Sequence, residues 1–263
     1  MNHALYIAKT GLEAQQFRLA AISNNIANAN TYGFKAGRAE FNDLIYQNVR
    51  QPGAQATQDE ANTLPSGLQL GTGVKAIGVQ KIHTQGNVMV TDNQLDLMVE
   101  GKGFFQVLDQ DGNLMYTRDG SFEVNQNGDI VTSSGYLLEP NINIPQDTTE
   151  ISITNDGAVF VSQPGNVGQN QIGQIELATF INPAGLEALG KNFFAETTAS
   201  GAPNINNPDT AEAGSVLQGA LEASNVNTVE ELIGMIEAQR TYEMNSKAIS
   251  AANGMMQYLN NNT

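Results

Sequence analysis

The glycine-rich segment from Gly71 to Ala76 could serve a cofactor, because closely spaced glycines can cradle a dinucleotide phosphate. Asp96 follows where a ribose-binding acid would be needed. A phosphate cradle also requires a helix N-terminus directly after the glycines. Here residues 76–82 alternate in the manner of a strand instead. The segment therefore favours a β-turn, and we expect no cofactor.

Two acidic groupings could bind a metal or move protons, but local structure explains both more simply. Residues 109–113 resemble a calcium loop, yet the glycine comes too early and Gly120 stands where a bidentate glutamate is required. A hairpin turn accounts for the same residues. Glu230 and Glu231 lie in the first turn of a predicted helix, where they complement its dipole. We predict neither a metal site nor catalytic carboxylates.

Composition excludes further classes of function. The 263 residues include no cysteine, and the two histidines are His3 and His83, which we expect on a terminus and on the polar face of a strand. A thiolate nucleophile or a serine–histidine relay is therefore not expected. The 27 acidic and 12 basic residues give a net charge of -15, which disfavours nucleic acid and anionic membranes. We predict a non-enzymatic protein without a nucleic-acid partner or direct membrane insertion.

Long helices are predicted at both ends, because all 8 prolines lie between Pro52 and Pro208. Asparagines and Gly33 should end the first helix near Asn28, and a capping box at Thr228 should start the second. Apolar residues recur every seven positions in each helix, which is the pattern of a coiled-coil seam. The candidate assembly interface consists of Leu5, Leu12, Leu19, Ile22 and Ile26 in the first helix, and Leu232, Met235, Ile236, Tyr242, Ile249, Met256 and Leu259 in the second.

Between the ends the period changes from seven to two, which indicates antiparallel strands. The dipeptides Asp111-Gly112, Asn127-Gly128 and Asp156-Gly157 should form hairpin turns, since Asn, Asp and Gly tolerate positive φ. Gln51 to Leu64 and Thr197 to Gly214 are predicted to be linkers or long surface loops. The fold class is therefore α+β, with terminal helices that form a coiled-coil inner domain and a mainly antiparallel β middle domain.

The domain organisation follows from these changes in pattern. We expect the helical inner domain to combine residues 1–40 and 218–263, with a connecting region at 41–75, the β domain at 76–196 and a return linker at 197–217. The apolar seams could pack within one chain or between copies. We expect contacts between copies, because an isolated pair of narrow seams buries little surface.

Both ends of the chain resemble the bacterial flagellar rod and hook proteins, the axial family of the basal body. The resemblance is carried at the N-terminus by residues 7–12, 14–16, 23–28 and 33–35, and at the C-terminus by residues 224–227, 230–232 and 239–248. The middle is similar to the distal-rod branch of that family at residues 50–55, 64–69, 71–74, 103–107 and 116–122. The resemblance spans essentially the whole chain.

The resemblance implies a structural subunit that polymerises into the hollow drive shaft between motor and hook. Its implied partners are other copies in a helical homopolymer, proximal rod proteins, hook protein, the surrounding rings of the basal body and the flagellar type III export apparatus. The implied location is the periplasm-spanning rod, reached without a cleaved signal peptide, which agrees with the absence of an apolar leader around Lys9 and Glu13. Another rod or hook subunit is an alternative. A coiled-coil-anchored β-domain surface adhesin is the alternative from a different class.

Overall fold

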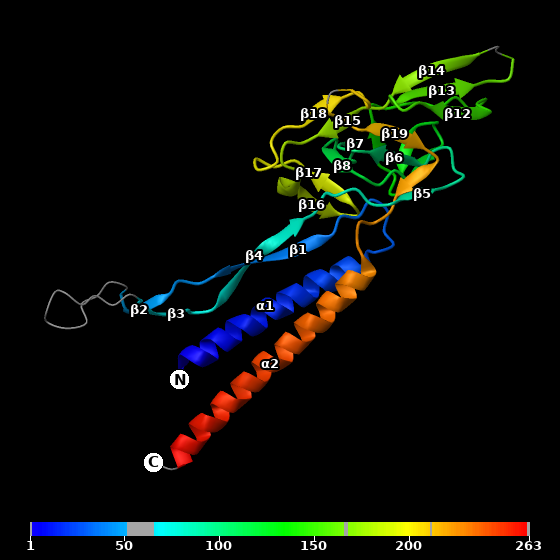
Figure 1. Cartoon of the computed structure of the whole chain (residues 1–263). Helices are drawn as coiled ribbons and strands as arrows, with labels where there is room; N and C mark the ends of the chain where they lie inside the picture. The colour runs from blue at the N-terminus through cyan, green and yellow to red at the C-terminus, as the bar shows by residue number, and fades with distance from the viewer. Residues whose placement is uncertain (1, 52–65, 166–167, 211, 262–263) are drawn as a thin grey trace. The chain divides into compact units, whose positions relative to one another are not determined.

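The computed structural model describes residues 2–51, 66–165, 168–210 and 212–261 (Figure 1). The chain forms two compact units. The helical unit contains residues 1–26, 37–80 and 228–263, and the β unit contains residues 27–36 and 81–227. Most of the predicted linker from Gln51 to Leu64 lies outside the described residues.

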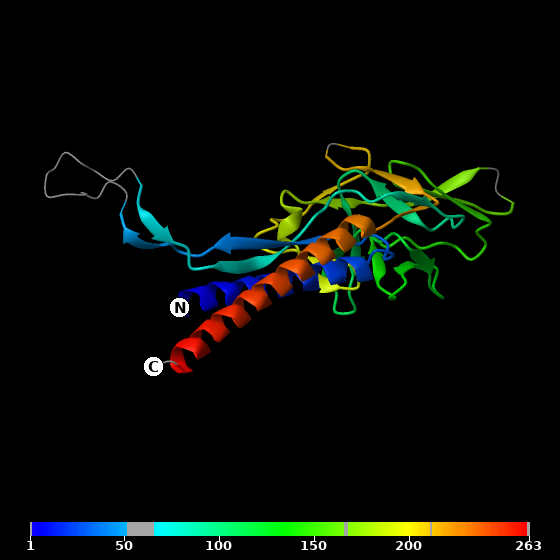
Figure 2. The same ribbon diagram turned by 60° about the horizontal axis from the view of Figure 1, so that its bottom comes forward.

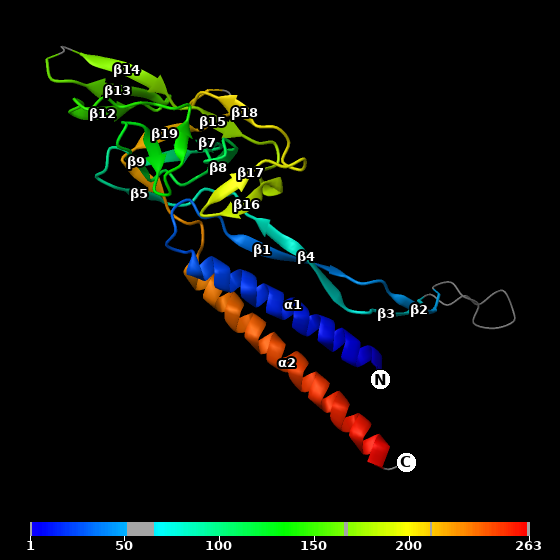
Figure 3. The same cartoon turned by 180° about the vertical axis from the view of Figure 1, so that it is seen from behind.

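The helical unit contains both helices and two short two-stranded sheets. Helix α1 spans Asn2–Ala27 and α2 spans Thr228–Asn261, so α1 ends within a residue of the predicted position and α2 begins at the predicted cap. The helices lie side by side, with the two chain termini at the same end of the pair (Figures 1 and 3). The sheets pair β1 (Gly37–Asp43) with β4 (Val74–Lys81) and β2 (Gln47–Arg50) with β3 (Leu68–Leu70).

The β unit is built around one nine-stranded sheet. Its main path runs in the order β16-β17-β8-β7-β11-β10-β9, and every pairing with a described register is antiparallel. The members of the path are β7 (Phe104–Leu108), β8 (Leu114–Thr117), β9 (Phe122–Val124), β10 (Ile130–Thr132), β11 (Leu137–Glu139), β16 (Glu187–Gly190) and β17 (Phe193–Ala195). The first residues of β7 also pair with β15 (Leu177–Thr179), which in turn pairs with β18 (Asn204–Asn206).

Three smaller sheets and a short helix complete the β unit. They comprise a three-stranded sheet of β12 (Glu150–Ile153), β13 (Ala158–Ser162) and β14 (Gln169–Gln174), the pair β6 (Leu97–Glu100) with β19 (Ser215–Gln218), the pair β5 (Val88–Val90) with β20 (Ala220–Glu222), and the 3-10 helix η1 (Pro183–Gly185). Figure 2 shows the strands from another side. The predicted loop from Thr197 to Gly214 thus contributes a strand, β18, to the large sheet.

The structure confirms the three predicted hairpin turns. Gly112, Gly128 and Gly157 have φ of 80°, 90° and 82°, and they connect β7 to β8, β9 to β10 and β12 to β13. The segment from Gly71 to Ala76 leads into strand β4, as its alternating pattern indicated, and not into a helix. Residues 109–113 likewise form a hairpin turn, in which the Gly112 amide donates to the Asp109 carbonyl at 2.9 Å.

The hydrophobic core of the β unit lies between the sheets. Its largest cluster gathers buried side chains from nine strands and the connections between them: Leu97, Val99, Phe105, Phe122, Ile130, Leu138, Ile142, Ile144, Ile153, Val159, Val161, Ile175, Leu177 and Val216. A second cluster is mainly aromatic and includes Phe104, Tyr116, Phe180 and Phe194. The terminal helices and this antiparallel β middle confirm the predicted α+β class. Over the described residues, neither helix combines the length and apolarity that a membrane span requires.

Two hairpin glycines provide a matched test of the turn geometry. A Cβ at Gly128 would lie 2.3 Å from the Ile144 carbonyl oxygen, whereas a Cβ at Gly112 would meet nothing within 4 Å. Both positions have positive φ, so each alanine variant should lose about 1 kcal/mol from backbone strain. Gly128→Ala should lose about 2 kcal/mol more, because a backbone atom must move. Thermal unfolding followed by circular dichroism would measure the difference, and equal losses would contradict it.

Candidate assembly surface and buried ion cluster

Polar contacts set the register between α1 and α2. Asn25 Nδ2 donates to Glu231 Oε1 at 2.7 Å. Further along the pair, Arg18 Nη2 lies 3.6 Å from Glu237 Oε2. Residue numbers increase along α1 as their partners decrease along α2, so the two helices are antiparallel.

Two glycines let the helices approach closely. A Cβ at Gly11 would lie 3.0 Å from the Asn245 amide nitrogen, and one at Gly234 would lie 3.5 Å from the Ile22 Cδ1 atom. Both glycines cost helix propensity. Their small size explains why they stand at points where the facing side chains reach across the pair.

Another face of α1 packs against the strands of the helical unit. The buried Asn25 side chain accepts the Gly37 N–H at 2.8 Å and donates to the Gly37 carbonyl at 2.9 Å. The Phe17 and Phe41 rings meet edge to face with centroids 6.5 Å apart. Helix α1 is therefore in contact with α2 and with strand β1, and Asn25 bonds to both.

The structure places the predicted seam residues in different environments. Ile22 is buried, and the exposure of Leu5, Leu12, Leu19, Ile26, Met235, Tyr242, Ile249 and Met256 is intermediate. Leu232 and Ile236 remain about half exposed. The side chain of Leu259 lies outside the described residues. The helices thus pair within one chain, although the pairing leaves much of the predicted interface uncovered.

Four large apolar side chains are exposed on one side of α2, and we call this set, Ile233, Ile236, Met244 and Met255, the outer stripe. At about 100° per residue these side chains fall within about 100° of one another around the helix axis. Met235, Ala238 and Tyr242 lie on the opposite side, and Ala238 is fully buried. The side chains of the outer stripe are 55%, 50%, 61% and 59% exposed, respectively. Arg240 and Lys247 fall within the same arc, so this side of α2 combines exposed apolar and charged side chains.

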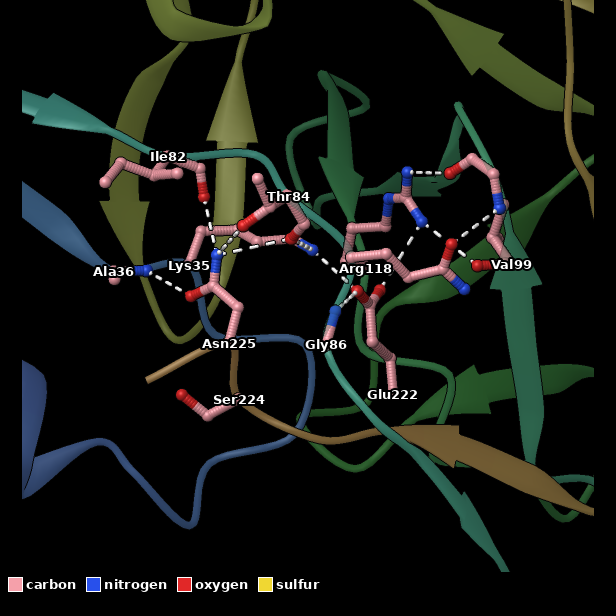
Figure 4. Close-up of polar contacts among 12 residues, drawn as sticks. Lys35, Ala36, Ile82, Thr84, Gly86, Val99, Arg118, Glu222, Ser224 and Asn225 are labelled. Atoms are coloured by element: carbon pink, nitrogen blue, oxygen red, sulfur yellow. Dashed lines mark hydrogen bonds and ion pairs between the residues drawn. The ribbon is translucent and has the colours of Figure 1, made fainter. Parts of the chain in front are cut away.

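A cluster of three buried charges lies in the β unit (Figure 4). Glu222, at the end of β20, accepts from Lys35 Nζ at 2.6 Å through Oε1, and its Oε2 lies 3.4 Å from Arg118 Nη1. The Arg118 guanidinium also donates to the carbonyls of Val99 and Gly101, at 3.1 and 2.6 Å. All three charged side chains are almost completely buried, with exposures of 1%, 6% and 0% for Lys35, Arg118 and Glu222.

Removing any one of the three charged side chains should destabilise the fold, because the remaining charges are buried. Burial lowers the pKa of the Lys35 ammonium, and the Glu222 carboxylate opposes that shift. Burial likewise lowers the pKa of the Arg118 guanidinium, again opposed by Glu222. Because one carboxylate serves two cations, its removal would leave both charges buried without a counterion, a loss of typically 3–5 kcal/mol. Sequence reasoning missed this cluster. The one hint is that Lys35 and Arg118 both fall in the family-like segments.

His83 is a correction to the sequence prediction. Its ring does not lie on a polar face but packs edge to face against Phe104 and Phe194, with centroids 5.7 and 5.8 Å away. Burial lowers the pKa of His83 to about 4, and the nearby cations of Lys35, Arg118 and Lys81 act in the same direction. Alternation along 76–82 could not reveal this, because His83 lies two residues beyond Lys81, the last residue of β4.

Three family models match this chain. They are described as flagella basal body rod protein over residues 5–35, flagellar hook protein FlgE/F/G D1 domain over residues 98–161, and flagellar basal body rod FlgEFG protein C-terminal over residues 217–262. The matches cover both helices and much of the β unit. The buried cluster draws one residue from each matched region, namely Lys35, Arg118 and Glu222.

Full-length relatives extend the similarity to the rest of the chain. The flagellar basal-body rod protein FlgG of Buchnera aphidicola (subsp. Acyrthosiphon pisum) is 49% identical over 98% of this chain and 99% of its own length. The protein of the same name from Caulobacter vibrioides is 49% identical over 97% of both chains. The one from Bacillus subtilis is 36% identical over 99% of both chains.

The environment of His83 predicts a pH dependence of stability. Between pH 6.5 and about 4 the unfolded chain binds a proton at His83 that the folded chain does not, so the free energy of unfolding should fall as pH falls through this window. The loss at pH 4 is at most about 3 kcal/mol. His83→Phe should remove this component when urea unfolding is compared at pH 7 and pH 4. The exposed His3 provides a comparison variant, His3→Gln, that removes one histidine without touching the aromatic cluster around His83. An unaltered pH dependence in His83→Phe would contradict the assignment.

Proposed function

Because this chain belongs to the family of flagellar basal-body rod proteins, we propose that it is a structural subunit of the distal rod, the hollow drive shaft that transmits torque from motor to hook. The family is one of structural flagellar proteins, so the chain is not an enzyme. In this role the chain polymerises with copies of itself and joins other rod and hook proteins in the basal body. Passage through the flagellar type III export apparatus, and contact with the surrounding rings, are part of the same proposal.

The observation that carries the proposal is the outer stripe, four large apolar side chains that remain exposed on the side of α2 opposite Ala238 and Tyr242. One face is covered by α1, and the outer stripe is half exposed or more. A monomeric protein has little reason to keep four large apolar side chains along one exposed helix face. A second copy that packs on the outer stripe would continue the helical layer, with each copy contacting two neighbours through different surfaces. Such a head-to-tail contact that does not close into a ring produces an open helical polymer.

Helical packing of this kind suits a shaft because its geometry is discrete. Apolar side chains of neighbouring helices interdigitate, and sliding by a fraction of a turn would require them to leave their holes. Covering one half-exposed Ile or Met contributes about 1 kcal/mol. Single contacts are thus weak, whereas a polymer repeats them at every copy. We propose that the outer stripe, together with the partly buried Leu12, Leu19 and Ile249, forms this interlocked coiled-coil layer.

The distribution of charge supports placing the contacts between copies on the helical unit. That unit contains seven basic and nine acidic residues, whereas the β unit contains five basic and 18 acidic residues. Two of the five basic side chains, Lys35 and Arg118, are buried and do not screen the surface. Like charges on neighbouring β units repel, and the nearly neutral helical units do not. Packing between copies is therefore most favourable through the helices.

The outer stripe can be tested with charged variants of α2. Ile233→Asp should prevent rod assembly and swimming, because it places a carboxylate in an interface that excludes water. The monomer should keep its unfolding midpoint, since the side chain is more than half exposed. Each variant is expressed in a strain of the source bacterium that lacks this gene. Swimming is measured in soft agar, and purified basal bodies are examined by electron microscopy. Gln239→Asp adds the same charge on another side of α2 and should swim. Normal swimming by Ile233→Asp would refute this interface.

The charge distribution predicts an effect of salt on the purified chain. Raising NaCl from about 0.05 M to about 0.5 M shortens the screening length several-fold and should weaken repulsion between β units. Self-association should therefore increase, as measured by sedimentation velocity. The Ile233→Asp variant should remain monomeric at both salt concentrations. Association that decreases with salt would show that attraction between charges, not apolar packing, holds the copies together.

A further inference from the structure

We propose that Glu222 and Asn225 form a clamp, held closed by Lys35 and Arg118, that binds together the chain segments through which torque enters and leaves the β unit. The inference rests on the proposed function, because a clamp of this kind matters only in a protein under load. It adds a mechanical role for side chains of the β unit that do not belong to the proposed outer stripe.

The two units are connected by the backbone at a few defined places. The chain passes between the helical unit and the β unit at four places, between residues 26 and 27, 36 and 37, 80 and 81, and 227 and 228. Force exchanged between the units along the backbone must pass through these crossings. On the side of the β unit they open into three segments, residues 27–36, 81–87 and 222–227. We call these the crossing segments.

Glu222 joins all three crossing segments. Its carboxylate accepts from Lys35 Nζ in the first segment and from the Gly86 N–H in the second, at 2.6 and 2.8 Å (Figure 4). Its backbone carbonyl accepts the Gly33 N–H at 2.8 Å. Lys35 also donates to the Thr84 carbonyl at 2.8 Å. One side chain therefore ties the segment that follows α1 to the strand that precedes α2.

Asn225 makes the same three-way connection a few residues later. Its Oδ1 accepts the Ala36 N–H at 2.7 Å, and its Nδ2 donates to the Ile82 carbonyl at 2.8 Å (Figure 4). The Asn225 N–H also donates to the Phe34 carbonyl at 3.3 Å. Asn225 thus reinforces the clamp immediately before α2 begins at Thr228.

Arg118 anchors the clamp in the body of the β unit. Arg118 follows β8, and its guanidinium contacts Glu222 while donating to carbonyls at Val99 and Gly101. A Cβ at Gly33 would lie 2.7 Å from the Arg118 carbonyl carbon, so the first crossing segment runs directly against this residue. Pulling on one crossing segment therefore loads the other two and the sheet, instead of peeling one segment away. Contacts loaded together resist force better than contacts broken in sequence, as in any cooperative network.

The experiment separates bearing load from folding and from assembly. The double variant Lys35→Met/Glu222→Gln removes one positive and one negative charge, which keeps the net charge of the buried cluster constant. Asn225→Ala leaves every charge in place and removes the hydrogen bonds that the side-chain amide of Asn225 makes. Glu150→Gln, at an exposed carboxylate of β12, is the matched control. Each is expressed in the source bacterium without its own copy of the gene, and rotation of single motors is recorded with beads of increasing size.

We expect both clamp variants to build rods and to turn small beads at wild-type speed, and to lose rotation under large beads. The Glu150→Gln control should match the wild type at every load. Wild-type rotation of both clamp variants at high load would overturn the clamp, as would the absence of rods from both despite folded monomers. If the double variant fails to fold, the clamp is judged from Asn225→Ala alone, by the presence of rods and by rotation under small and large beads. Failure of the wild-type gene itself to restore rods would instead refute the proposed function.

Discussion

The structure depends on one buried carboxylate that serves two buried cations. Desolvation disfavours every charge in this cluster. The three side chains are therefore stable when they are buried together, and removing one of them leaves a buried charge without its counterion. Lys35 follows α1, Arg118 follows β8 and Glu222 closes β20, and the sequence separations between them are large. Closing such long loops costs entropy that only a folded β unit repays. The three crossing segments therefore reach their positions only when the β unit folds.

The two compact units divide the physical tasks of the molecule. The β unit has its own apolar core and most of the negative charge, which favours a single, soluble fold. The helical unit has little net charge, and α2 keeps the outer stripe exposed while α1 covers its other side. The helical unit leaves apolar side chains exposed within its own chain, so it is suited to polymerisation. The β unit buries an apolar core of its own and is negatively charged, so it is suited to stay apart from other copies.

Most of the secondary structure could be predicted from local chemistry. The asparagines after Ile26, the capping-box pattern at Thr228 and the Asp-Gly and Asn-Gly turns act within a few residues. The structure confirms the end of α1, the start of α2 at Thr228 and the three turns. The prediction was wrong for His83, because the alternation of a strand says nothing about a residue just beyond its end. It also grouped Ile236 with Met235 in one seam, whereas the pairing of α1 with α2 places them on different faces.

The sequence by itself determined the α+β class, the ends of the helices, the hairpin turns and the family resemblance, because each of these depends on residue type and short-range spacing. Only the tertiary structure decided which apolar face of α2 is covered, that Asn25 binds both Gly37 and Glu231, and that Lys35, Arg118 and Glu222 meet in a buried cluster. The physical reason is range. A buried charge is stable only beside a partner, and that partner is brought near by folding, from a part of the chain whose distance along the sequence carries no signal of the encounter.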